Sequence, residues 1–212
     1  AYGIYLAYID DFLRELGEDS AAVFRAAGID DPAAIQQGER ISVETLADVV
    51  RSVNRHVRRS SFFLELGARI PLMAHGNLGS AIMACKDVRT VLSIMERYTA
   101  IVLPAVRVSL QQQGGDAVVE YQISTHCAEL NIALVEALIS TSQYNISLLT
   151  AQPFFPKRVS VTFKPPLHAA LYQNFTRCEV EFNATSNNMV FTQAQLDLPI
   201  RTANALNQRV ML

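Results

Sequence analysis

The sequence predicts an α+β fold in which a helical N-terminal lobe packs on a small, mainly antiparallel sheet with a long buried helix. Three observations support this prediction. Apolar residues recur at helical spacing through most of the first hundred residues, an apolar–polar alternation of period two begins at Val106, and residues 128–149 are apolar around most of a helix circumference. Half of the 212 residues are hydrophobic and only 18% are charged, which indicates a well-buried core rather than a disordered chain.

The first sixty residues are predicted to form three helices. Gly17 and Gly28 each follow a short run of helical spacing, and glycine is the residue that most often ends a helix. Ser42 is a good N-cap for a longer helix to about Arg58, because its hydroxyl can accept a hydrogen bond from a free backbone N–H. Acidic residues come early in this helix and arginines come late, an order that the helix dipole favours.

Three more helical segments are predicted before the sheet begins. One short helix starts near Phe62 and stops at Pro71, and a second one ends at Cys85. Asp87 is the predicted N-cap of the third and longest of these helices, because a run of apolar residues at helical spacing follows it. This run closes at Pro104, where the helix is expected to end.

The pattern of the second half changes from helical spacing to alternation. Residues 106–110 and 117–123 alternate on either side of Gly114-Gly115, which predicts a β-hairpin with a glycine-rich turn. The remaining predicted elements are, in order, the buried helix at about 128–149, a strand at 159–163, a short helix at 167–175, two short strands at 180–182 and 189–191, and a helical tail after Pro199.

Charge and motif content argue against several classes of function. The net charge is −2, whereas proteins that bind DNA directly usually carry a basic excess that neutralises phosphates. The three cysteines and four histidines show no metal-ligand spacing, so we expect no metal, no disulfide framework and no cofactor. No nucleophile or nucleotide-binding motif is present, and we do not expect an enzyme. The most apolar stretch, residues 132–139, contains Glu136 and is too short to span a bilayer, which predicts a soluble chain.

Two short patterns leave a functional and a structural interpretation open. Arg55 and Arg59 could grip phosphates, as in a cyclic-dinucleotide site, but arginines near a helix C-terminus also follow from the helix dipole. Gly76 and Gly79 could cradle an anion at a helix start, or they could form only a turn. The structural interpretation is favoured for both pairs.

Several soft motifs follow one another over nearly the whole chain, from about Phe12 to about Ile200. They include Ala27-Gly28-Ile29, Leu66-Gly67-Ala68-Arg69, Gly76-Asn77-Leu78-Gly79, Asp87-Val88-Arg89-Thr90-Val91-Leu92, Asn187-Asn188-Met189-Val190-Phe191 and Leu196-Asp197-Leu198-Pro199. In this order and spacing they resemble the arabinose-binding-type N-terminal domain of bacterial AraC-type transcription regulators.

The resemblance implies a cytoplasmic domain that binds a small-molecule effector, forms a homodimer and controls a C-terminal helix-turn-helix domain. Residues 1–200 would form this domain, with a helical lobe at about 1–103 and an α+β lobe at about 104–200. Residues 201–212 would begin the linker to a DNA-binding domain that the sequence lacks, so DNA binding would need that domain. The alternative is a protein–protein or dimerisation module without a small-molecule ligand.

The resemblance does not specify an effector, and the site is therefore predicted from the elements alone. Pockets favour junctions between layers, so we expect the effector where the helical lobe meets the sheet. Methionines would form an adaptable apolar wall, and polar side-chain tips would orient the ligand, although each residue also has an ordinary core or surface role. The predicted site residues are Met73, His75, Met83, Tyr98, Arg107, Tyr121 and His126.

Overall fold

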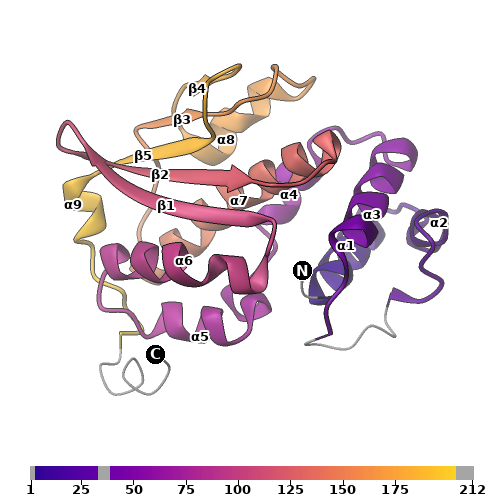
Figure 1. Ribbon diagram of the computed structural model, residues 1–212, viewed down its shortest axis with the longest axis horizontal. Helices are drawn as coiled ribbons and strands as arrows, with labels where there is room; N and C mark the ends of the chain where they lie inside the picture. The colour runs from indigo at the N-terminus through magenta and orange to yellow at the C-terminus, as the bar shows by residue number, and fades with distance from the viewer. Residues whose placement is uncertain (1–2, 33–38, 204–212) are drawn as a thin grey trace.

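The computed structural model describes residues 3–32 and 39–203 of the chain (Figure 1). Within these residues the fold is α+β, as predicted, with a group of N-terminal helices beside a five-stranded sheet and the helices that pack on it. Residues 201–203 are not helical, and the rest of the predicted helical tail, with most of the predicted linker, lies outside the described residues.

The N-terminal helices begin and end close to the predicted positions. Gly17 and Gly28 both adopt positive φ after the first two helices, a backbone conformation that glycine reaches without strain. Ser42 caps the third helix as predicted, since its Oγ accepts a hydrogen bond from the backbone N–H of Thr45 at 3.0 Å. These helices are α1 (Ile4–Glu15), α2 (Ser20–Ala26), α3 (Val43–His56) and α4 (Phe62–Gly67).

The next helices lead into the sheet, and Asp87 caps the longest of them as predicted. One of its carboxylate oxygens accepts hydrogen bonds from the backbone N–H of Thr90 at 2.8 Å and from the Thr90 hydroxyl at 2.6 Å. Burial raises the pKa of Asp87, but these hydrogen bonds and the positive charge of Lys86 outweigh burial and leave the pKa below its ordinary value. The elements are the 3-10 turn η2 (Leu72–His75), α5 (Asn77–Met83) and α6 (Val88–Val102); α5 ends before the predicted Cys85.

Asp87→Ala should lower the free energy of unfolding by about 1 kcal/mol at pH 7, because the first turn of α6 loses its side-chain acceptor. The lowered pKa means that this contribution is complete above the ordinary value of 3.8 and is lost as the pH falls through the folded value. Urea unfolding at pH 7 and at pH 3 measures both effects. A difference between variant and wild type that is as large at pH 3 as at pH 7 would contradict the capping role.

The sheet is built on the predicted hairpin and is mainly antiparallel. Val108 lies opposite Tyr121, which sets the hairpin register, and β2 pairs with β5 on its other side. The one parallel pair is β3 with β4, at the sheet edge. The strand order is β1-β2-β5-β3-β4, with β1 (Val106–Gln113), β2 (Asp116–Ile123), β3 (Arg158–Ser160), β4 (Val180–Glu181) and β5 (Asn188–Thr192).

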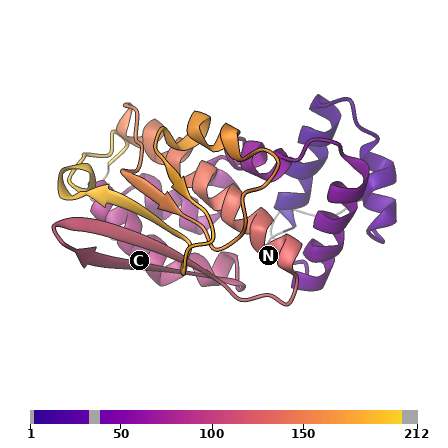
Figure 2. The same cartoon turned by 90° about the horizontal axis from the view of Figure 1, so that it is seen from above.

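The long helix α7 (Ala128–Thr150) connects the two parts of the molecule (Figure 2). Its first half packs against α3, and it passes α4 and β2 before it ends near Arg201. By length and composition α7 could cross a membrane, and half of its most apolar window is buried inside the fold. The helical elements that follow it in the described residues are η3 (Ala169–Leu171), α8 (Tyr172–Thr176) and α9 (Gln193–Leu196), the last of which was not predicted from the sequence.

Two hydrophobic cores result, and α7 contributes to both. The N-terminal core contains residues of α1 to α4 together with Leu130 and Ala133 of α7. The sheet core contains the inner face of the sheet, residues of α5 and α6, and Ile139 and Ile146 of α7. Helices α5 and α6 precede residue 103 and pack with the sheet, so the cores do not divide where the two predicted lobes meet.

Candidate functional site

A cavity of about 80 Å³ lies at the boundary of the N-terminal core, and we call it the first chamber. Its wall comes from α1, α3, α4 and α7, and nearly all of its surface is apolar. The α7 side of the wall uses the small residues Ala133 and Ala137, which leave space between the helices. The other apolar residues of the wall are Ile9, Leu46, Val50, Phe63, Leu66, Ile70, Leu103, Leu130, Leu134 and Leu138.

A second chamber of about 60 Å³ lies on the sheet-core side. It is enclosed by η2, α5, α6 and the second half of α7, and its polar side chains come mainly from α6 and α7. Thr99, Thr141, Ser142 and Asn145 supply these groups, and His75 of η2 adds an imidazole. The apolar residues of the wall are Leu72, Leu78, Ile82, Val91, Met95, Val102, Leu103, Leu138, Ile146 and Leu149.

The two chambers share four wall residues, and His75 is the most distinctive of them. His75, Leu103, Leu138 and Thr141 line both chambers, so they form the partition between them. The Nδ1 atom of His75 is hydrogen-bonded to the hydroxyl of Tyr5 at 2.6 Å, a contact between residues 70 positions apart. Burial lowers the pKa of His75 to about 4, so the imidazole is uncharged at neutral pH.

Polar side chains of α7 form hydrogen bonds to the end of α4 and to the loop that follows it. Thr141 donates to the carbonyl of Gly67 at 2.6 Å, and Asn145 donates its amide to the carbonyl of Ile70 at 3.0 Å. These bonds satisfy the two carbonyls where α4 ends and leave the Asn145 Oδ1 atom without a hydrogen-bond partner among the described residues. A ligand in the second chamber could therefore donate a hydrogen bond to this oxygen.

Among the predicted residues from the helical part of the chain, only His75 lines a chamber. Met73 is 52% exposed, and Met83 is partly buried beyond the chamber wall, where its carbonyl accepts from Thr202. Tyr98 packs against the edge of the sheet core and has the guanidinium of Arg97 over its ring. The structure thus does not bring these three side chains to His75.

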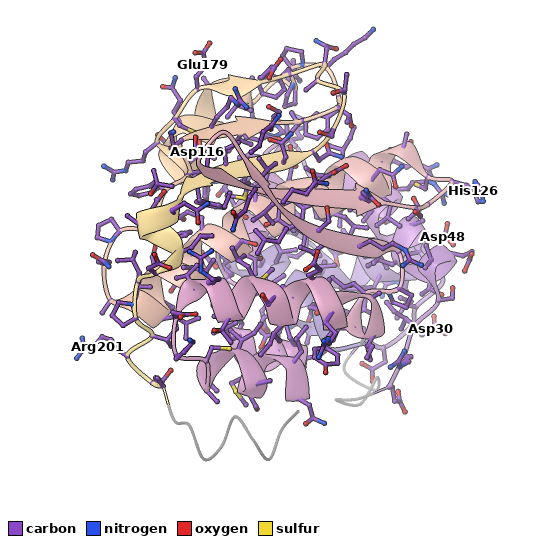
Figure 3. All side chains as sticks on the ribbon, turned by 60° about the vertical axis from the view of Figure 1, so that its left-hand side comes forward. Asp30, Asp48, Asp116, His126, Glu179 and Arg201 are labelled. Atoms are coloured by element: carbon purple, nitrogen blue, oxygen red, sulfur yellow. The ribbon has the colours of Figure 1, made fainter. Side chains whose placement is uncertain are left out.

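The predicted residues on the hairpin and after it lie in three different environments. Arg107 is exposed on the sheet face opposite to Val106 and Val108, which point into the core. Tyr121 is buried in the sheet core and does not line a chamber, but its hydroxyl is hydrogen-bonded at 3.0 Å to Ser142, which lines the second chamber. His126 projects outward at the edge of the molecule, as Figure 3 shows.

Several residues of the chamber walls were not predicted from the sequence. Tyr5, Thr141 and Asn145 were not among the predicted site residues, although all three line a chamber. A usable signal did exist, because polar residues at positions i and i+4 of a mostly buried helix share one face and need partners. Leu138, three positions before Thr141, completes that face.

Arg55 and Arg59, for which a phosphate-binding interpretation was left open, are not arranged to bind one phosphate group together. Helix α3 ends at His56, so Arg59 does not follow Arg55 by one helical turn. The guanidinium of Arg59 already holds Glu65 through two hydrogen bonds, at 2.7 and 2.8 Å. Among the described residues, no group of three or more histidine, cysteine, aspartate or glutamate side chains could hold a metal ion.

A buried polar cluster lies on the other side of α7. Glu136 is 2% exposed, and its Oε1 atom accepts hydrogen bonds from His168 at 2.6 Å and from the Tyr172 hydroxyl at 2.8 Å. Burial and the negative charge of Glu136 raise the pKa of Tyr172 far above its usual range, so Tyr172 stays a donor. This cluster anchors the segment before α8 to α7 and does not line either chamber.

Apolar cavities at the junction of packed layers, with a few polar groups, are typical of small-molecule-binding domains. The family model of the arabinose-binding domain of AraC transcription regulators, N-terminal, matches residues 17–200. The chain therefore belongs to this family, which confirms the resemblance seen in the sequence and places it with the N-terminal domains of transcription regulators.

Individual relatives agree with the family. The chain is 22% identical over 200 residues to the ornithine utilization regulator of Pseudomonas aeruginosa, covering 94% of this chain and 59% of that protein. It is 24% identical over 182 residues to an uncharacterized HTH-type transcriptional regulator of Mycobacterium tuberculosis, covering 84% and 52%. The structure of the transcriptional regulator CdpR from Pseudomonas aeruginosa has a TM-score of 0.71 at 15% identity, covering 97% of this chain and 60% of that one. The chain thus spans a little over half the length of these relatives.

Proposed function

We propose that this chain is the effector-sensing domain of a cytoplasmic AraC-type regulator and that the effector binds in the two chambers that meet at His75. The observation that supports this most directly is the position of the chambers at the boundary between the two cores. A ligand there contacts α1 and α3 on one side and α5 and α6 on the other. Binding would therefore favour one placement of the N-terminal helices against the sheet.

In the proposed function, effector binding changes how two copies of the chain associate and, through this, how the whole regulator binds DNA. The N-terminal helices would form or adjust a homodimer, and the dimer would position C-terminal helix-turn-helix units of the whole regulator. The alternative is a protein–protein or dimerisation module in which the chambers are only imperfections of packing. These two functions differ in one measurable property, which is whether a small molecule stabilises the folded chain.

A thermal-shift screen against a metabolite panel tests the proposal. A ligand at 100 times its Kd contributes about 2.7 kcal/mol to the native state, which corresponds to a rise in Tm of about 5–10 °C for a chain of this length. Leu138→Phe should abolish the shift, because Leu138 lines both chambers and the larger ring fills the space between them.

Leu148→Phe is the matched control, because it makes the same change on the same helix at a side chain that is 59% exposed and outside both chambers. It should respond like the wild type. No shift with any compound, together with no small molecule in the mass spectrum of the natively purified chain, would overturn the proposal in favour of the interaction module. An equal shift in Leu138→Phe would move the site elsewhere.

A further inference from the structure

The chemistry of the chamber walls restricts the ligand, and this inference rests on the proposed function. We propose that the effector is an uncharged, mainly apolar molecule that occupies both chambers at once and displaces His75 from the partition between them. Three properties of the walls carry this inference: their charge, their size and the way in which His75 is held.

The walls offer no counter-charge to a ligand. No aspartate, glutamate, lysine or arginine is among the described residues that line either chamber. His75 is the one side chain there that could become a cation, and burial lowers its pKa to about 4, so it is neutral at physiological pH. An ion that leaves water without a partner loses its hydration with no compensation, so amino acids, carboxylates and phosphates are disfavoured.

The walls do offer a small number of neutral polar groups. In the second chamber, the Oδ1 atom of Asn145 has no hydrogen-bond partner among the described residues, and the hydroxyl of Thr99 is likewise unpaired within the described part of the chain. Both groups can bind a hydroxyl or an amide of a ligand. A mainly apolar ligand that carries one hydroxyl or amide group therefore fits the second chamber.

The size of the chambers requires the ligand to use both. An apolar cavity of roughly 150 Å³ admits a benzene ring, and each chamber, at about 80 and 60 Å³, is only about half as large. His75 stands in the partition, together with Leu103, Leu138 and Thr141. Moving the imidazole away joins the chambers into one elongated space.

A hydrogen bond that crosses the boundary between the cores holds His75 in the partition. His75 follows Ala74 at the end of η2 and precedes Gly76, which has φ +58°, so the ring sits at a turn rather than inside a long helix. The Tyr5 hydroxyl, from α1, holds its Nδ1 atom at 2.6 Å. Displacing His75 therefore breaks a contact to α1 and connects ligand entry with the N-terminal helices.

A matched set of probes tests the ligand class: 1-octanol, octanoate and octylammonium, which share one chain and differ in charge. Isothermal calorimetry at pH 7 should give a Kd for 1-octanol at least tenfold lower than for either ion. Leu138→Phe should abolish binding, and Leu148→Phe should bind like the wild type. If an ion binds as tightly as the alcohol and Leu138→Phe abolishes its binding, the ligand class is wrong while the proposed site stands.

Tyr5→Phe tests the partition, because it keeps the ring and removes the hydroxyl that holds His75. It should bind 1-octanol about three to ten times more tightly, since entry no longer breaks that hydrogen bond. Tyr144→Phe, an exposed tyrosine on α7, is the control and should not change the Kd. His75→Ala removes the imidazole from the partition and should also bind 1-octanol more tightly. Unchanged affinity in both Tyr5→Phe and His75→Ala would overturn the role of His75, and no binding by any probe or metabolite would overturn the proposed function as well.

Discussion

Gly67→Ala is expected to lower the free energy of unfolding by more than about 3 kcal/mol, because α4 and α7 cross in contact at this glycine. A Cβ atom at position 67 would lie 2.8 Å from the Cα of Ala137 and closer still to the Ala137 carbonyl and the Ser140 hydroxyl. Backbone atoms cannot rotate away from it as a flexible side chain could. The two helices would have to separate, and the wall of the first chamber would separate with them.

Gly17→Ala is the control for this effect. Gly17 has φ +74° and no atom within 4 Å of the position of a Cβ, so alanine there costs only backbone strain, about 1–2 kcal/mol. Urea unfolding followed by circular dichroism compares the two variants. If Gly67→Ala loses no more stability than Gly17→Ala, the helices do not approach as closely as described.

Glu136→Leu is expected to lower the free energy of unfolding by about 2–5 kcal/mol. The substitution leaves the ring nitrogen of His168 and the hydroxyl of Tyr172 buried without their shared acceptor, and each buried unpaired group costs about 1–3 kcal/mol. The leucine would recover part of this loss through its own burial. Urea unfolding at pH 7 measures the difference.

Glu136→Gln separates hydrogen bonding from charge. Its amide oxygen can still accept from both His168 and Tyr172, so the loss should be less than half of that for leucine. Both variants should keep the thermal response to an effector, because Glu136 does not line the chambers. A loss of that response in folded Glu136→Gln would contradict the separation of this cluster from the site.

Local chemistry explains the elements that were correctly predicted from the sequence. The caps at Ser42 and Asp87 depend on a side chain and an N–H three residues away, and the structure contains both bonds. The hairpin depends on alternation and on two glycines at its turn, both of which adopt positive φ. The four-residue helix α9 was missed because it is too short to show an apolar period, although its capping box, Thr192 with Gln195, is present in the sequence.

The predicted site residues show what local sequence patterns do not predict, which is the direction in which each side chain points. The predicted location was a junction of helical and sheet layers, whereas the residues that line the chambers come from helices and the loops beside them, and of the predicted residues His75 lies between the chambers. Arg107 was chosen because it lies on the hairpin, but neighbouring residues of a strand point to opposite faces, and Val108 takes the inner one. His126 lies just beyond β2, where the chain turns outward.

By itself, the sequence determined the fold class, the caps, the hairpin and the family, because each depends on residues close together in the chain or on the order of motifs. Only the tertiary structure decided which side chains share a cavity. Tyr5 and His75 are 70 positions apart in the chain. The two hydrogen bonds from α7 to loop carbonyls join residues at similar separations: Thr141 and Gly67 are 74 positions apart, and Asn145 and Ile70 are 75 positions apart. The pairs on α7 form because this helix runs between two cores and its buried polar groups need partners, and no periodicity along the chain encodes which partners they meet.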